Sequence, residues 1–166
     1  MKILAAFLIL LLPFSFVACG KAEKPDCRDI LSAMTDAEVG LPSGRIYSMS
    51  AMRGDEEYLS EHLINSLYGE GGIPVMAEGW LDLALFLPSH DHPCEMAVFL
   101  CNSNETAIDT ARMLSRRLGS LRQIKQDSEF SYYFESASVT IRGNYVLLVI
   151  SSDTENAIKS ASKIIG

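Results

Sequence analysis

Two histidines, an aspartate and a cysteine lie within five positions in the stretch SHDHPCEM, residues 89–96. Imidazole and thiolate groups are the ligands that zinc and copper favour in proteins. The i, i+2, i+4 spacing of His90, His92 and Cys94 brings these side chains to one side if the segment is extended. Neighbouring residues of one strand do not complete a tetrahedron, so a metal site here needs a ligand from elsewhere. Candidates for that ligand are Glu95, Asp91 and His62.

The same stretch also fits a loop between two strands. Pro88 and Pro93 bracket the two histidines, and serine, aspartate and proline are common turn residues. In this interpretation the segment offers metal ligands without holding a metal. A surface metal site, a catalytic or regulatory metal and a plain turn are therefore all open alternatives.

A second group of chemically interesting residues is a basic run. Five cations and no acid occur between Ala111 and Gln126. Arg112, Arg116 and Arg117 are the candidate site for an anion, which can be a lipid headgroup, a teichoic acid or an acidic partner protein. The alternative is a solvated helix face whose arginines pair with local acids.

The sequence predicts neither an enzyme nor a cofactor. Cys94 or Cys101 with a histidine has the residue types of a nucleophile–base pair, but no orienting third group follows at a recognisable spacing. Cys101 follows four apolar residues and fits a small buried side chain. The motifs GxSxG, HExxH, CxxC and GxGxxG do not occur, and the glycine-rich stretch YGEGGIP lacks the lysine of a phosphate-binding loop.

The N-terminus has the pattern of an export signal. Lys2 precedes an apolar run that is too short for a membrane span and ends in FVAC. This ending resembles the bacterial lipobox, with Phe16 in the place of the usual leucine. We expect a signal peptide over residues 1–18, a lipid such as palmitate on Cys19, a tether over 19–26 and one domain over 27–166. Two acyl chains would hold the protein at the extracytoplasmic face of the cell membrane.

Charge and cysteine content restrict the partners and the crosslinks. The formal net charge of −7 becomes −8 when Lys2 is removed with the signal, which argues against nucleic acid as a partner. With Cys19 lipidated, at most one disulfide is possible among Cys27, Cys94 and Cys101. Cys94 and Cys101 flank one predicted strand and lie about 23 Å apart, too far to pair. We expect free thiols.

Hydrophobic spacing predicts the elements that position these residues. Helical spacing occurs over residues 27–37, 55–68, 102–125 and 155–165. Strands are expected over 80–88, where Leu81, Leu83, Leu85 and Leu87 share one face, and over 95–101. Gly143-Asn144 predicts a hairpin between two further strands. These units form two ββα repeats, which favours an α+β fold with a four-stranded, mainly antiparallel sheet, helices on one face and extra N-terminal helices.

Several segments resemble a known family. EMAVFLC, the RRL of the following helix, IRGNYVLLVISSDTENAI and the helix end INSLYG are similar to domain-of-unknown-function family 4358, an uncharacterised family of small bacterial lipoproteins. The likeness covers roughly residues 28–165, and GNYVLLVIS is its most specific part. It implies a lipid-anchored protein of Gram-positive anaerobes. The family has no catalytic residues or substrate to carry over.

Together these patterns predict an extracytoplasmic lipoprotein with a non-enzymatic binding or scaffold role at the cell envelope. Its partner would be the membrane, through Cys19, together with an envelope protein or a cell-wall polymer. The alternative is a solute- or metal-binding lipoprotein that uses the His90, His92 and Cys94 loop.

Overall fold

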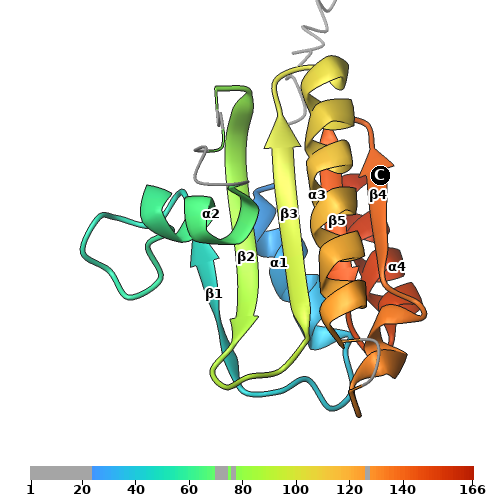
Figure 1. The fold of residues 1–166 in the computed structure, drawn as a ribbon. Helices are drawn as coiled ribbons and strands as arrows, with labels where there is room; N and C mark the ends of the chain where they lie inside the picture. The colour runs from blue at the N-terminus through green and yellow to red at the C-terminus, as the bar shows by residue number, and fades with distance from the viewer. Residues whose placement is uncertain (1–23, 70–74, 76–77, 126–127) are drawn as a thin grey trace, which may run out of the picture.

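A five-stranded antiparallel sheet forms the centre of the molecule (Figure 1). The computed structural model describes residues 24–69, 75, 78–125 and 128–166, so the predicted signal peptide and Cys19 lie outside the described residues. The strand order is β1-β2-β3-β5-β4, and every neighbouring pair is antiparallel. The strands are β1 (Gly44–Ser48), β2 (Trp80–Pro88), β3 (Glu95–Cys101), β4 (Ser138–Arg142) and β5 (Tyr145–Ile150).

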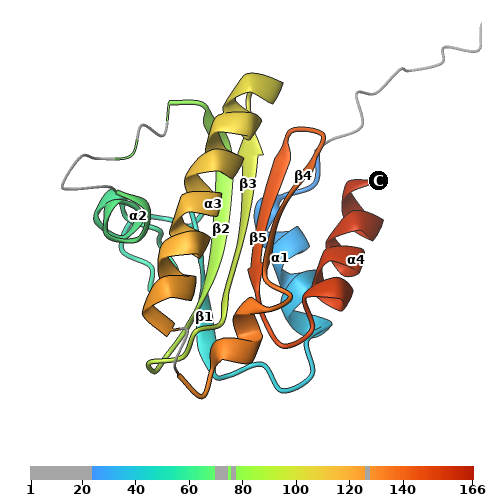
Figure 2. The same ribbon diagram turned by 45° about the vertical axis from the view of Figure 1, so that its right-hand side comes forward.

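Helices cover both faces of the sheet. The helices are α1 (Cys27–Asp36), α2 (Glu61–Tyr68), α3 (Asn104–Lys125) and α4 (Thr154–Ile165), with a short 3-10 turn η1 (Ser131–Phe134). Figures 1 and 2 show α2 and α3 on one face and α1 and α4 on the other. Every residue of β3 and β5 is buried as a result.

The predicted α+β fold is confirmed, and three details differ. The helix expected over residues 55–68 begins only at Glu61, where Ser60 caps it. The helices cover two faces rather than the expected one, which accounts for the unbroken apolar run MAVFLC that follows Glu95 in β3, because a strand buried on both sides has no solvent-facing side. The fifth strand, β1, was not expected, since GRIYS is short and largely polar. It pairs with β2 at the edge of the sheet.

The β4–β5 hairpin forms as predicted. Arg142 pairs with Tyr145, which leaves Gly143 and Asn144 as a two-residue turn. Gly143 has a φ of 57°, the left-handed conformation that such a turn requires.

The domain has two distinct ends. Lys24 lies beside the β4–β5 turn and the last residues of α4, and all three segments line the same concave surface. We call this the N-terminal end. The opposite end holds the β2–β3 loop, the last turn of α3 and η1, where Lys125 pairs with Asp91 and His92 contacts Phe130. Figure 2 shows the two ends separated by the length of the strands.

Candidate functional site

The predicted metal ligands in the β2–β3 loop are not brought together. His90 is exposed, whereas Cys94 is buried in the core. The ring of His92 packs against the rings of Phe130 and Tyr133, with centroid distances of 5.2 and 4.9 Å. Its Nδ1 accepts a hydrogen bond of 3.1 Å from the backbone N–H of Cys94. Within the described residues, no three His, Cys, Asp or Glu side chains are placed to hold a metal ion, and the loop acts as a turn with an aromatic anchor.

The three cysteines of the domain are buried free thiols. Burial raises the pKa of the Cys94 thiol to about 12, and the nearby carboxylates Glu38 and Glu95 add to this effect. Burial likewise raises the pKa of Cys101 and, with help from Asp82, that of Cys27. Nucleophilic attack and metal binding need the thiolate, which such surroundings disfavour.

Arg117, one of the predicted anion-binding residues, is turned into the protein. Its Nε lies 2.9 Å from Oε1 of Glu95 and its Nη2 lies 2.5 Å from Oε2, while Nη1 donates to the carbonyl of Leu67 at 2.6 Å. The Arg117 and Glu95 side chains are only 18% and 5% exposed. Tyr68 completes the cluster, because its hydroxyl donates to Glu95 and its ring lies under the guanidinium. Through its contacts with Leu67 and Tyr68, the Arg117–Glu95 pair connects α2 with β3 and α3.

The other predicted arginines lie in different surroundings. Arg112 pairs with Asp109 across an exposed turn of α3, at 2.6 Å. Arg116 lines a pocket of about 220 Å³ between α2 and α3. The expectation of one anion surface made by Arg112, Arg116 and Arg117 is therefore wrong for Arg117, since the buried carboxylate of Glu95 already binds its charge.

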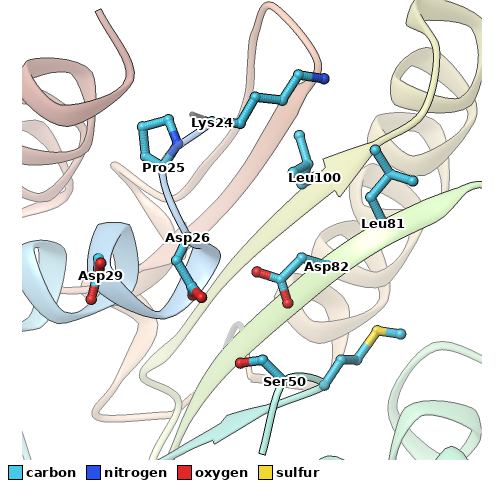
Figure 3. Close-up of a pocket in the computed structure, with 9 residues that line it drawn as sticks. Lys24, Pro25, Asp26, Asp29, Ser50, Leu81, Asp82 and Leu100 are labelled. Atoms are coloured by element: carbon cyan, nitrogen blue, oxygen red, sulfur yellow. The ribbon is translucent and has the colours of Figure 1, made fainter. Parts of the chain in front are cut away.

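A larger hollow, missed by sequence reasoning, lies at the start of α1. It is an open groove of about 640 Å³ between α1, the segment after β1 and the sheet face formed by β2 and β3 (Figure 3). Its lining combines carboxylates with apolar side chains. The lining residues are Lys24, Pro25, Asp26, Asp29, Met49, Ser50, Leu81, Asp82 and Leu100. We call it the acidic groove.

The acidic side of the groove is built on the first turn of α1. Asp26 is the N-cap residue, and its Oδ1 accepts from the N–H of Arg28 at 2.7 Å. Asp82, on β2, accepts from the N–H of Cys27 at 2.9 Å. The helix N-terminus therefore complements both negative charges. Asp29 adds a third carboxylate from the same turn, and Figure 3 shows Asp26 and Asp82 directed toward each other.

The apolar side of the groove results from a β-bulge. The β2–β3 register shifts between Trp80 and Asp82. Trp80 turns inward, where its Nε1 donates to Thr110 at 2.8 Å, and Leu81 is left 58% exposed over the groove. The expected alternation with Leu81 on the face of Leu83 is therefore wrong at this one position. Bulges commonly redirect side chains beside binding sites.

This arrangement suits a ligand that carries a positive charge on an apolar body. The lining holds three carboxylates and one cation, and Figure 3 shows the Lys24 ammonium directed away from Asp26 and Asp82. Leu81 and Met49 supply exposed apolar surface beside the charges. The volume falls in the range of small-ligand sites. No sequence motif marks the groove, because Asp82 is distant from Asp26 and Asp29 in the chain and a bulge has no clear residue signature.

Comparison with known proteins does not indicate a family or a function for this chain. No protein-family model matches the chain, and neither a curated protein nor a solved structure is significantly similar to it.

Proposed function

We propose that this chain is a lipid-anchored, extracytoplasmic binding protein that holds a cationic ligand with an apolar body. The acidic groove is the observation that carries the proposal, since it sets three carboxylates beside exposed Leu81. Membership of family 4358 and a place at the envelope of a Gram-positive bacterium belong to the same proposal. Neither the family membership nor the place at the envelope requires a catalytic role.

A non-enzymatic role is supported by how the reactive side chains are used. The thiols of Cys27 and Cys94 are buried and held protonated by their surroundings. Arg117 and Glu95, the most buried ion pair among the described residues, are joined by mutual hydrogen bonds and by a bond from Arg117 to the backbone. These groups stabilise the fold, and the groove is left as the place where a ligand meets charge and apolar surface together.

The anchor follows from the lipobox-like FVAC. The Cys19 thiol would form a thioether to a diacylglycerol, and its acyl chains would hold the protein at the membrane. In the part of the chain that the structure describes, no helix has the length and apolar character for a membrane span. Radiolabelled palmitate should enter the wild-type chain in cells and should not enter Cys19→Ala. Equal labelling of both would overturn the assignment.

The ligand proposal is tested with two dipeptides of opposite charge. A Leu-Lys amide should shift the backbone amide resonances of Leu81 and Ser50 in an NMR titration, whereas a Leu-Glu dipeptide should not. Asp29→Asn should weaken the Leu-Lys interaction by up to about fivefold, the effect of losing one exposed ion pair.

Asp36→Asn is the matched control for this titration. Asp36 is an exposed aspartate at the other end of α1 and does not line the groove, so its replacement should leave the interaction unchanged. Equal shifts with both dipeptides, or equal weakening by both variants, would contradict a charge-selective groove.

A further inference from the structure

A second hollow lies on the other side of Lys24 and Pro25. It measures about 370 Å³ and is bounded by the N-terminal segment, the β4–β5 turn and the end of α4. Its lining holds two cations, and none of its side chains is acidic. The lining residues are Lys24, Pro25, Arg142, Gly143, Asn144, Tyr145, Ile165 and Gly166.

Exposed apolar side chains accompany these cations. Ile164 lies in the last turn of α4, and Ile141 precedes Arg142 in β4 and projects from the opposite face of that strand; both lie at the same end of the domain and are 37% and 36% exposed. Lys163 adds a third cation in the same turn and complements the negative end of the helix. We call Lys24, Ile141, Arg142, Lys163 and Ile164 the basic corner.

The chain is firmly held where it leaves the basic corner. The Tyr145 hydroxyl donates to the Pro25 carbonyl at 2.7 Å, and the N–H of Cys27 is bound by Asp82. Cys19 lies five residues before Lys24. Five residues span at most about 18 Å, so a lipid on Cys19 keeps the basic corner close to the bilayer.

We propose that the basic corner rests on the anionic lipid surface, with Lys24 and Arg142 against headgroup phosphates and Ile141 and Ile164 at the interface. This inference rests on the proposed anchor at Cys19. Each cation near an anionic leaflet favours the bound orientation by about fivefold. The neighbouring acidic groove, which shares Lys24 with the corner, would be repelled by the same lipids, so the corner should meet the bilayer with the groove turned away from it. The β2–β3 loop then points away from the membrane, about 24 Å along β3.

Fluorescence quenching in vesicles tests this orientation. The full acylated chain is reconstituted with a thiol-linked dye at Ile141→Cys or Ile164→Cys, or at Tyr132→Cys as the probe of the opposite end. Tyr132 is exposed, and the native cysteines of the domain are buried. Lipids with a spin label on the headgroup should quench the dyes at 141 and 164 several-fold more than the dye at 132. The difference should be larger with phosphatidylglycerol present than in phosphatidylcholine alone.

Charge reversal tests whether the basic corner, rather than the lipid tether alone, orients the domain on the membrane. Arg142→Glu with Lys163→Glu should reduce quenching at 164 several-fold in phosphatidylglycerol vesicles, whereas Lys125→Glu at the opposite end should not. Arg142→Lys should retain the quenching. The inference is overturned if the three dyes are quenched equally or if charge reversal has no effect. A chain that takes up no palmitate would instead refute the anchor itself, so the two failures are distinguishable.

Discussion

At the scale of single residues, the Arg117–Glu95 pair shows how a charged side chain can be withdrawn from the surface. Both groups are desolvated, and desolvation is offset only because three hydrogen bonds join the guanidinium to the carboxylate and a fourth reaches Leu67. A helix wheel does not contain this information. The charge of Arg117 was visible in the sequence, and its partner on β3 was not.

Removing Arg117 should leave a buried carboxylate without a partner. We expect Arg117→Met to lower the free energy of unfolding by about 3–5 kcal/mol at pH 7, measured by urea denaturation. Glu95→Leu combined with Arg117→Met should recover much of the loss. A loss below 1 kcal/mol would mean that the pair contributes little.

His92 should make stability depend on pH. Burial lowers its pKa below the ordinary 6.5, and its neutral ring accepts from the N–H of Cys94. Because the folded pKa lies below the unfolded one, protonation favours unfolding, and stability should fall as the pH drops below about 6.5. Thermal unfolding of His92→Gln between pH 7.5 and 5 should show a flatter profile than wild type. His90→Asn, at an exposed position, should keep the wild-type slope.

At the scale of elements, the edge strand β1 depends on one glycine. A Cβ at Gly44 would lie 2.4 Å from the Phe86 ring and 2.5 Å from the Leu87 carbonyl oxygen. Gly44→Ala should therefore cost about 1–3 kcal/mol of unfolding free energy, because the β1–β2 pair must move apart. Gly119→Ala is the opposite case, since nothing lies near its Cβ in the exposed middle of α3. Gly119→Ala should raise the free energy of unfolding by about 0.5–1 kcal/mol. Denaturant midpoints that move in the same direction would contradict this reading.

Elements could be predicted from the sequence where local patterns decide them. The β4–β5 turn followed from Gly143-Asn144, and β3 itself followed from its apolar run, whereas its cover by helices on both faces was not expected. The β2 bulge could not be predicted, because it depends on Trp80 reaching Thr110 on another element. The acidic groove depends on this bulge, so it was hidden for the same reason.

At the scale of the whole molecule, long-range polar contacts close the domain. Glu38 lies in the loop after α1 and accepts from the backbone N–H groups of Ser152 and Asp153 at the start of α4. More than a hundred residues separate these partners, and no pattern in the sequence relates them. At the N-terminal end, Pro25 and Asp26, expected to belong to the tether, contact the folded domain.

These contacts predict where the chain can be shortened. A chain that begins at Lys24 keeps the Tyr145–Pro25 hydrogen bond and the Asp26 cap, so it should unfold in urea with the midpoint and slope of a chain that begins at Gly20. A chain that begins at Ser32 loses the fully buried Cys27, Ile30 and Leu31, which exposes one face of the sheet. It should lose its cooperative transition, because α1 is the described helix that packs on β2 and β3 from that face. A cooperative transition in the shorter chain would show that α1 is dispensable, and the acidic groove would then rest on an optional element.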